Sequence, residues 1–432
     1  MKYEKIDRGL FLENRNRLKS LMAPNSMAIL LSNDEMPRSG DQNYDFHQQP
    51  DLFYLTGIGQ EKTILVFFPD SPNPMYREAL FIRRTNEHIQ VWEGHKHNIE
   101  DAREISGIEN VYWVDTFEDI LPSLMIYADN VYINTNENDR AAVTLPYNDL
   151  RFAKTLREHY PAHNFKRLAP LMQQLRAVKQ AEEVRLTAKA IAITREAFLR
   201  VLKFVKPGVM EYEVEAEIIG EFIRNRATGH AYSPIIAAGA NANILHYNDN
   251  NQPCRDGDML LMDFGAEYAH YCADLTRTIP VNGRFSPRQK AVYNAVLRVM
   301  KEAKNMLAPG VILTEYNLEV GKIMERELIT LGLIDKNDVA NQSPAQPLYK
   351  KYFMHGTSHF LGLDVHDVGA RYKPMQVGNL FTVEPGIYIP EEKMGIRLEN
   401  NVLITASRTI DLMEKIPIEI EEIEDIMQQN KA

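Results

Sequence analysis

The sequence predicts a mixed α/β (α+β) protein of two domains, the second of which contains an internal repeat. Its 432 residues are too many for one ordinary hydrophobic core, so two domains are the default expectation. Helical and strand-like segments alternate in the first part of the chain, whereas the second part shows one pattern twice. We place the boundary near residue 172, which gives domains 1–172 and 173–432.

The first domain is predicted from a regular alternation of segments. A charged amphipathic stretch over 8–22 has the pattern of a helix. Short apolar segments follow it at 26–32, 52–58, 63–68, 79–84, 111–115 and 130–134. Around 165–180 a proline precedes a new helical pattern, in which apolar residues are spaced for one face, and this change marks the boundary.

The repeat consists of a helical stretch, a Pro-Gly-Val turn and a second helix. The stretch 181–205 leads to "KPGVMEYEVEAEI" (206–218), and 287–307 leads to "APGVILTEYNLEVGKI" (308–323). In both copies Glu-Tyr-x-x-Glu follows Pro-Gly-Val, with two extra residues in the second copy. A shared pattern of this kind indicates two related structural units.

Each copy then places acids at the end of a predicted strand. "GDMLLMDFG" (257–265) and "GNLFTVEPG" (378–386) both read Gly, five residues, an acid, one residue, Gly, which makes Asp263 and Glu384 equivalent. A second acid follows after a turn, Asp274 in one copy and Glu399 in the other. Such a pattern arises by chance in single loops, but its recurrence in the same order argues against chance. Four converging carboxylates repel one another strongly unless cations lie between them, so we expect two divalent ions.

Three histidines lie close together in "MHGTSHFLGLDVHDVG" (354–369), namely His355, His359 and His366. Any one of them alone would be interpreted as a core or surface histidine. Three beside a set of carboxylates indicate a site. An imidazole ligand would shift the preferred metal from magnesium or calcium towards manganese, cobalt, iron or zinc.

Composition excludes several classes of function. The 44% hydrophobic and 25% charged content is that of a soluble globular protein, and the net charge of −10 provides no basic face for nucleic acid. The charged amino terminus lacks the apolar core of a signal peptide, and no apolar run approaches the roughly 20 residues that cross a bilayer. Two cysteines, Cys254 and Cys272, make no disulfide framework. We expect a cytoplasmic protein without membrane or nucleic-acid partners.

Several motifs resemble those of the proline-specific aminopeptidases and dipeptidases, which belong to the pita-bread metallopeptidase family together with methionine aminopeptidase. They are "LHY" (245–247), "LMDFG" (261–265), "ADLTRT" (273–278), "HGTSHFLGLDVHDVG" (355–369), "TVEPGIYI" (382–389) and "GIRLEN" (395–400). The first domain is similar too, because "RSGDQNYDFHQQPDLFYLTG" (38–57) resembles aminopeptidase P. The resemblance spans nearly the whole chain and implies a creatinase-like amino-terminal domain before a pita-bread domain with a pseudo-twofold axis.

The resemblance implies that two divalent ions, usually manganese, are bound by Asp263, Asp274, His359, Glu384 and Glu399. Asp263 would hold one ion, His359 and Glu384 the other, and the remaining two acids would bridge them. Cobalt, zinc or iron would be accepted by the same donors. One departure is the Asn-Asn pair at 400–401, where related sequences often read Asp-Asp. This loss of charge could alter the affinity for metal.

Further roles follow from the same resemblance. Glu384 would transfer the proton between the attacking water and the leaving nitrogen. His246 and His366 would bind the substrate and stabilise the oxyanion, with His355 beside them. Arg397 would orient the carboxylates, unless it is an exposed strand arginine.

Other candidates have an equally ordinary interpretation. Tyr388 could donate to Asp274 or to substrate, although a strand tyrosine usually serves packing. Asp41 could bind the substrate's ammonium group and Trp92 its side chain, or both could be surface or packing residues. The resemblance also implies a homodimer or homotetramer.

The expected function is removal of the first amino acid from short peptides that have proline second. A prolidase, which splits Xaa-Pro dipeptides, is the nearest alternative, and Arg371 or Lys373 could bind the free carboxylate that such an enzyme must recognise. A binding protein that has lost its metals, or a metal-free hydrolase of the creatinase kind, would have no reason to retain all five metal ligands.

Overall fold

The computed structural model describes residues 3–138, 140 and 144–429, which form two compact units. The amino-terminal unit is Lys5–Arg176. The carboxy-terminal unit begins at Ala177 and, among the described residues, also includes Tyr3 and Glu4. The boundary expected near residue 172 falls inside helix α7 (Ala169–Ala177), whose last residue opens the second unit.

The amino-terminal unit is built on a six-stranded mixed sheet of order β6-β5-β4-β1-β7-β8. Its strands are β1 (Ser26–Leu31), β4 (Ile64–Phe67), β5 (Glu78–Ile82), β6 (Asn110–Trp113), β7 (Asn130–Ile133) and β8 (Asn164–Arg167). Strands β4 and β1 are antiparallel, and β1, β7 and β8 are parallel. All six residues of β1 are buried, as expected for a central strand that is covered on both faces.

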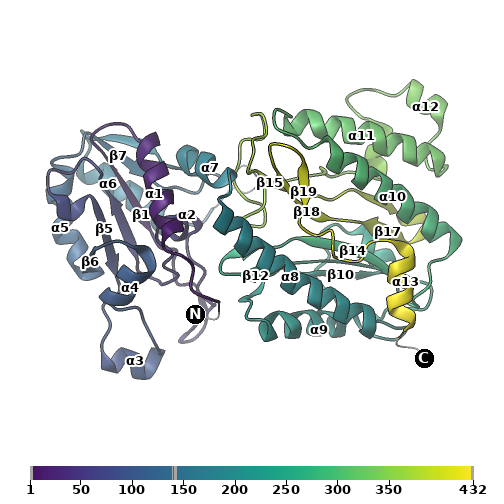
Figure 1. Ribbon diagram of the computed structural model, residues 1–432, viewed down its shortest axis with the longest axis horizontal. Helices are drawn as coiled ribbons and strands as arrows, with labels where there is room; N and C mark the ends of the chain where they lie inside the picture. The colour runs from purple at the N-terminus through teal and green to yellow at the C-terminus, as the bar shows by residue number, and fades with distance from the viewer. Residues whose placement is uncertain (1–2, 139, 141–143, 430–432) are drawn as a thin grey trace. The chain divides into compact units, whose positions relative to one another are not determined.

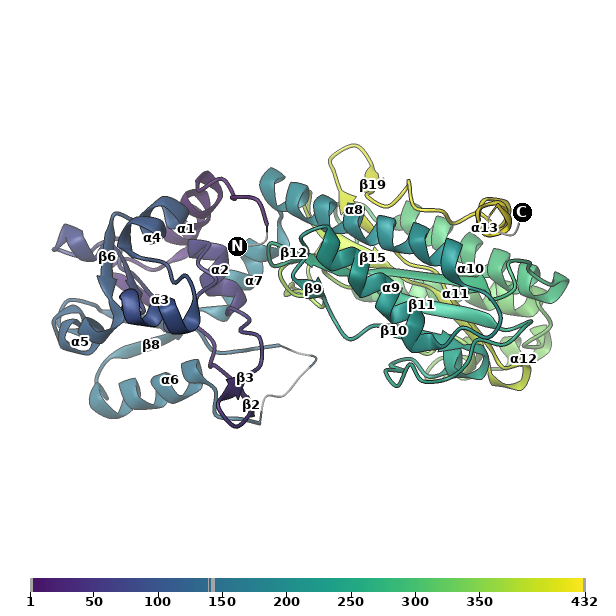
Figure 2. The ribbon, with the colours of Figure 1, turned by 90° about the horizontal axis from the view of Figure 1, so that it is seen from below.

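Helices cover both faces of this sheet (Figure 2). One face carries α1 (Gly9–Leu21), α2 (Pro50–Thr56) and α4 (Ile99–Ser106), and the other carries α5 (Phe117–Met125) and α6 (Asn148–His159). The apolar segment 52–58 therefore belongs mostly to a helix. A short hairpin of β2 (Pro37–Ser39) and β3 (Gln42–Asn43) and the helix α3 (Glu87–Glu93) bury none of their residues.

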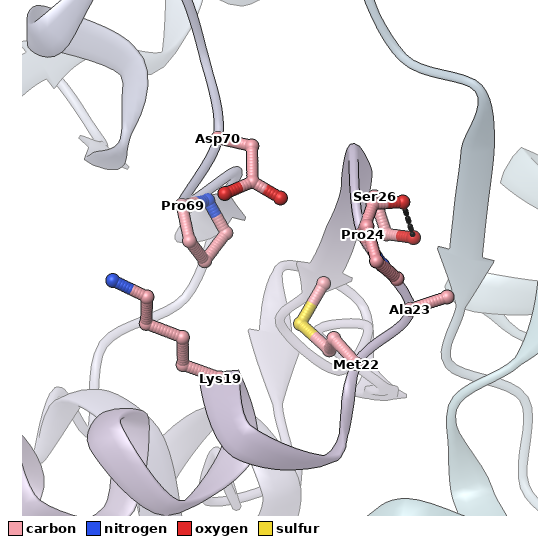
Figure 3. Close-up of a pocket in the computed structure, with 7 residues that line it drawn as sticks. All are labelled: Lys19, Met22, Ala23, Pro24, Ser26, Pro69 and Asp70. Carbon is pink, nitrogen blue, oxygen red and sulfur yellow. Dashed lines mark hydrogen bonds between the residues drawn. The ribbon is translucent and has the colours of Figure 1, made fainter.

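A surface pocket of about 250 Å³ lies beside the end of α1 (Figure 3). Its lining residues are Lys19, Met22, Ala23, Pro24, Ser26, Pro69 and Asp70. Its one carboxylate, Asp70, already accepts a hydrogen bond from the backbone N–H of Asn25 at 2.7 Å. The lining contains neither a cluster of metal-binding groups nor a nucleophile with a neighbouring base, so we assign the pocket no catalytic role.

The carboxy-terminal unit combines two helix pairs with short antiparallel sheets (Figure 1). Helices α8 (Ala181–Phe204) and α9 (Glu211–Arg224) lie side by side, as do α10 (Pro287–Met306) and α11 (Leu313–Thr330). The remaining helices are α12 (Lys336–Ala340) and α13 (Ile420–Gln428). The strands of the first copy are β9 (Gly229–His230), β10 (Ile235–Ala238), β11 (Met259–Phe264), β12 (Ala266–Tyr268), β13 (Tyr271–Cys272) and β14 (Leu275–Pro280). Those of the second are β15 (Leu380–Val383), β16 (Gly386–Ile389), β17 (Met394–Arg397), β18 (Asn400–Ile404) and β19 (Thr409–Asp411).

The two Pro-Gly-Val turns have the same geometry. Gly208 and Gly310 both have φ of 93°, and their N–H groups donate to the backbone oxygens of Cys254 and Met375, each three residues before the glycine that opens the strand motif. Matching bridges join Met210 to Pro253 and Ile312 to Pro374. The two copies therefore align at their Pro-Gly-Val turns without an insertion. In this alignment the Glu-Tyr pair of the second copy lies two residues later than that of the first.

Strand pairing also corrects the assumed equivalence of the second acids. In the first copy Asp263 lies opposite Thr276 and Met262 opposite Arg277. In the second copy Val383 lies opposite Asn400, so the next pair in that register is Glu384 with Glu399. Glu399 thus corresponds to Thr276, and the position of Asp274 corresponds to Arg397. The pseudo-symmetry holds for the strands and for Asp263 and Glu384, whereas Asp274 and Glu399 occupy unequal places on them.

Two properties that bear on cellular setting can be stated for the described part of the chain. None of its helices has the length and apolar composition needed to cross a bilayer. Cys254 and Cys272 are buried and unpaired.

Gly265, between β11 and β12, generates a prediction about stability. A Cβ there would lie 1.7 Å from the backbone oxygen of Ala273, so Gly265→Ala must separate the segments that carry Asp263 and Asp274. Overpacking of this kind costs about 3 kcal/mol. Calorimetry should show the unfolding transition of the carboxy-terminal unit lowered by roughly 5–10 °C.

The matched control is Gly220→Ala on the exposed surface of α9, where a Cβ has no neighbour within 4 Å. Alanine there should stabilise the helix by about 0.5–1 kcal/mol. An unchanged transition in Gly265→Ala would contradict the tight backbone approach at Gly265.

Candidate active site

Asp263 and Asp274 meet at the end of β11 and the start of β14, where a partly buried tyrosine lies between them. The hydroxyl of Tyr232 is 2.6 Å from Oδ1 of Asp263 and 2.6 Å from Oδ1 of Asp274. Burial, followed by the neighbouring carboxylates, raises the pKa of Tyr232 well above its ordinary value, so it remains a phenol. Because a phenol has one proton, it can donate to only one carboxylate at a time.

His359 faces the same carboxylates from the second copy. Its Nδ1 lies 2.9 Å from the backbone oxygen of Phe360, an acceptor, so Nδ1 carries the proton in the neutral ring. Its Nε2 is 3.3 Å from Oδ2 of Asp274 and 3.6 Å from Oε1 of Glu384. A lone pair on Nε2 directed at two carboxylates needs a cation or a proton between them. This tautomer is the one that a metal-binding histidine requires.

Backbone hydrogen bonds hold His359 and Glu384 in adjacent segments. The N–H of Thr382, in β15, donates to the oxygen of His359 at 3.0 Å, and the N–H of Glu384 donates to the oxygen of Thr357 at 2.8 Å. The N–H of His359 donates in turn to the hydroxyl of Thr382. Strand pairing therefore sets the distance between the imidazole and the carboxylate.

Glu399 completes the group. Its Oε2 accepts a hydrogen bond from the hydroxyl of Thr276 at 2.7 Å, whereas its Oε1 is buried and receives no hydrogen bond from any residue in the described part of the chain. One ligand atom each from Asp274, His359 and Glu399 lie within 4.8 Å of one another. An orphaned carboxylate oxygen beside an imidazole lone pair fits a bound cation, since a buried unpaired carboxylate is costly.

The electrostatics of the cluster lead to the same conclusion. Burial, the largest cause, raises the pKa of Asp274 and Glu399 above their ordinary values, and the other acids of the cluster contribute further. Burial likewise raises the pKa of Glu384 to about 7. The pKa of His359 is raised because its hydrogen bond to Asp274 and the nearby acids outweigh burial, which by itself lowers it. Divalent cations would restore the ionised carboxylates and the neutral imidazole.

Arg397 is buried, so the alternative of an exposed strand arginine is wrong. Its guanidinium donates to Oδ2 of Asp263, to the hydroxyl of Tyr388 at 2.8 Å and to the hydroxyl of Thr276 at 3.2 Å. It thereby fixes Asp263 on the side that faces away from Tyr232.

Tyr388 does not contact Asp274, contrary to one of its expected roles. Its hydroxyl lies 2.8 Å from Nε2 of His355, whose Nδ1 lies 2.7 Å from the backbone oxygen of Gly356. Burial, the largest cause, lowers the pKa of His355 to about 3, so its ring is neutral, with the proton on Nδ1. Arg397 therefore donates to Tyr388, and Tyr388 donates to His355. The tyrosine that bonds to Asp274 is Tyr232. Nothing in the sequence distinguishes Tyr232 except its position just before β10, so it was not predicted.

The Asn-Asn pair has a structural role that the sequence did not reveal. The side chain of Asn401 receives the N–H of Asp274 at 3.1 Å and donates to its backbone oxygen at 2.7 Å. Asn400 accepts from the buried guanidinium of Arg277 at 2.7 Å and donates to Asp411. Both amides are thus used as donor and acceptor at once.

The remaining candidates are more exposed. His366 is exposed, and its ring lies edge to face with that of His359 at a centroid distance of 4.5 Å. His246 is exposed in the loop after the 3₁₀ helix η3 (Gly239–Asn243). Asp41 and Trp92 belong to the amino-terminal unit, where both are exposed, and their roles stay predictions.

The raised pKa of Glu384 yields a prediction about the metal-free protein. A protonated Glu384 stabilises the fold fully below the unfolded pKa of about 4.5, and this contribution is lost as pH rises through about 7. Glutamine remains neutral throughout. Between pH 4.5 and 7, Glu384→Gln should therefore become more stable relative to the native sequence, by an amount on the order of 2–3 kcal/mol.

Thermal unfolding of both chelator-treated proteins at pH 4.5 and pH 7.5 measures this difference. Manganese added at pH 7.5 should reverse the order, because the native carboxylate binds the ion and the amide does not. A stability difference that is the same at both pH values would contradict burial of an ionised Glu384.

Comparison with known proteins agrees with this geometry. Residues 185–406 match the model of metallopeptidase family M24, and residues 11–132 match the amino-terminal domain of aminopeptidase P. The Xaa-Pro aminopeptidase of Haemophilus influenzae is 33% identical, over 98% of each chain. Two solved structures of E. coli aminopeptidase P, one zinc-substituted with product and one with the inhibitor Pro-Leu, cover 99% of this chain and 100% of theirs. Their TM-scores are 0.88 and 0.87, at 30% and 31% identity.

These findings confirm the family and the fold class that the motifs indicated. The two matched regions lie one in each unit, in the order found in aminopeptidase P. The chain is therefore a metallo-aminopeptidase of family M24 and belongs to the Xaa-Pro aminopeptidases.

Proposed function

We propose that this enzyme hydrolyses the bond between the first residue and a proline at the second position of short peptides, with two divalent ions. The observation that carries the proposal is the set of buried groups around Nε2 of His359, in which Glu399 keeps an orphaned oxygen and Glu384 has a pKa of about 7. The ions would be held by Asp263, Asp274, His359, Glu384 and Glu399. Manganese is the expected metal, since carboxylate oxygens predominate over a single imidazole.

Bound divalent ions supply polarisation of the scissile carbonyl and a lower pKa for the attacking water. Glu384 is suited to carry the proton, because its partly buried carboxylate belongs to the proposed ligand set and lies 3.6 Å from Nε2 of His359, next to where the attacking water would bind. It would take the proton from the attacking water and deliver it to the proline nitrogen as the C–N bond breaks. Water's hydroxyl ends on the carboxyl product, and its proton ends on the released amine.

His246 and His366 would donate to the oxygen of the scissile carbonyl as its negative charge develops. Both are exposed enough to meet a substrate. His355 cannot donate through Nε2, which accepts from Tyr388, so we give it the role of orienting its neighbours. Arg397 and Tyr388 would hold His355 through the chain of hydrogen bonds described above.

Proline specificity has a physical reason. The nitrogen of an Xaa-Pro bond carries no hydrogen and the ring fixes φ, so enzymes that bind an amide hydrogen or adapt φ do not cleave it. The Pro-Leu inhibitor of the E. coli relative, which begins with proline, supports a proline-binding site in this chain as well.

Three further features belong to the proposal. A homodimer or homotetramer is supported by the exposed apolar side chains of Val91 and Trp92 on α3, at 80% and 77% exposure. A cytoplasmic location is supported by the buried, unpaired Cys254 and Cys272. Asp41 and Trp92 would contact substrate from the amino-terminal unit.

Hydrolysis of an Xaa-Pro-Yaa tripeptide and of the matching Xaa-Pro dipeptide tests the function. With manganese added, the tripeptide should be cleaved to one amino acid and Pro-Yaa, and chelation should abolish the activity. Metal analysis of the active protein should find two ions per chain. Cleavage confined to the dipeptide would identify a prolidase instead, and absence of hydrolysis in the metal-loaded protein would leave a binding protein.

The role of His366 can be separated from metal binding. His366→Ala should lower kcat about 100-fold, the loss usual for one oxyanion donor, while metal content is kept. His159→Ala, an exposed histidine at the end of α6, is the matched control and should leave kcat unchanged. Loss of metal from His366→Ala would instead make His366 a metal ligand.

A further inference from the structure

Glu211, the first residue of α9, is a buried carboxylate that the mechanism does not use. Both of its oxygens are saturated by hydrogen bonds. Oε1 accepts from the N–H of Ala238 at 2.8 Å and from Nδ2 of Asn241 at 3.0 Å. Oε2 accepts from the hydroxyl of Tyr247 at 2.8 Å and from the N–H of Gln252 at 2.9 Å.

These four donors lie on both sides of His246 in the sequence. Ala238 and Asn241 precede it, and Tyr247 and Gln252 follow it. The N–H of Glu211 also donates to the backbone oxygen of Gln252 at 3.0 Å, so both the side chain and the backbone of Glu211 bond to Gln252. One carboxylate thus closes the loop 238–252 at both ends, and its charge is favoured by the amino terminus of the helix.

Other contacts orient this loop towards the site. Tyr247 is buried in an apolar cluster that also contains Tyr388. The 3₁₀ helix η3 approaches β17 so closely that a Cβ on Gly395 would lie 2.3 Å from the oxygen of Ala242. The imidazole of His246 is itself exposed and forms no hydrogen bond with a described residue. Its position therefore depends on the backbone that Glu211 holds.

In the second copy of the repeat, the helix after Pro-Gly-Val also holds a loop, although from positions that do not correspond to Glu211. On α11, the side-chain oxygen of Asn317 accepts the N–H of Thr357 at 2.8 Å, and the hydroxyl of Tyr316 accepts from Ser358 at 3.2 Å. Thr357 and Ser358 directly precede His359. In each copy, the helix after Pro-Gly-Val uses polar side chains from its first turns to hold a loop that carries a site histidine.

We propose that Glu211 is a positioning residue that holds His246 in place for the reaction. This inference rests on the proposed function for its kinetic consequence, but the holding of the loop can be tested without activity. A purely structural role would instead make Glu211 matter to the stability of the unit and not to His246 in particular.

A double-mutant cycle with the manganese-loaded enzyme and an Xaa-Pro-Yaa peptide separates the two roles. His246→Ala should lower kcat/KM about 100-fold, and Glu211→Gln at least about 10-fold, with metal content retained in both. Glu211→Gln should add less than about twofold in the His246→Ala background, because its effect passes through the imidazole. Losses that multiply would overturn the proposal.

Glu213→Gln is the matched control on the same helix turn. Glu213 is exposed and accepts the N–H of Met210 at 2.8 Å, so it caps α9 without touching the loop. Its substitution should leave kcat/KM unchanged. A loss as large as that of Glu211→Gln would assign the effect to the helix terminus and overturn the proposal.

Hydrogen exchange supplies a readout that does not depend on peptidase activity. The amides of Ala238 and Gln252 should exchange at least about 10-fold faster in Glu211→Gln than in the native sequence, with other β10 amides unaffected. Unchanged exchange would overturn the proposal even if the enzyme cleaves Xaa-Pro peptides. Faster exchange in a protein that cleaves no such peptide would reject the proposed function while the loop assignment stands.

Tyr247→Phe serves if Glu211→Gln does not fold, because it removes one of the four hydrogen bonds and keeps the ring. It should lower kcat/KM a few-fold in the native background and have no effect after His246→Ala. An equal loss in both backgrounds would contradict positioning through His246.

Discussion

Mutual repulsion among four acids beside one imidazole, two of them buried and two partly buried, is the constraint on which the carboxy-terminal unit depends. Removing ionised carboxylates from water costs several kcal/mol each unless a counter-charge is near. The raised pKa values of Asp274, Glu384 and Glu399 express that cost as a tendency to take up protons. Divalent ions bound among these acids would remove the cost, because they favour the ionised form of each carboxylate.

The groups that hold these acids are mostly neutral. Tyr232, Thr276 and Asn401 donate hydrogen bonds to them or to their backbone, and Arg397 is the one cation in direct contact with a member of the ligand set among the described residues. Arg277 lies behind the strands, where burial, the largest cause, lowers its pKa to about 10 and its hydrogen bonds go to oxygens of uncharged groups. Most of the negative charge of the proposed ligands is thus left without a protein counter-charge among the described residues.

Much of this could be predicted from the sequence, because motif order and the repeated strand-acid pattern depend on local residue types. The four carboxylates that the repeat predicted lie close together, with His359 beside them. The alignment of the two copies could not be predicted from the sequence. Glu-Tyr recurs in both copies, but the backbone hydrogen bonds at Gly208 and Gly310 determine which residues correspond. The roles of Tyr232 and Asn401 could not be predicted, because they arise from contacts with Asp274 across 42 and 127 residues of chain and have no local sequence pattern. Asp41 and Trp92 lie in the other unit, so no local pattern relates them to the site.

The hydrogen bonds across the repeat have a consequence for how the protein is made. Asn401 of the second copy holds Asp274 of the first, Thr276 of the first holds Glu399 of the second, and Arg397 bonds to Asp263. Neither copy therefore contains by itself all the residues that hold these acids in place. During synthesis, the chain up to Asp274 would leave the ribosome long before its partners at 397–401 exist. The site can therefore assemble only after the second copy has been translated, and a product truncated before residue 397 would lack the residues that hold Asp263 and Asp274.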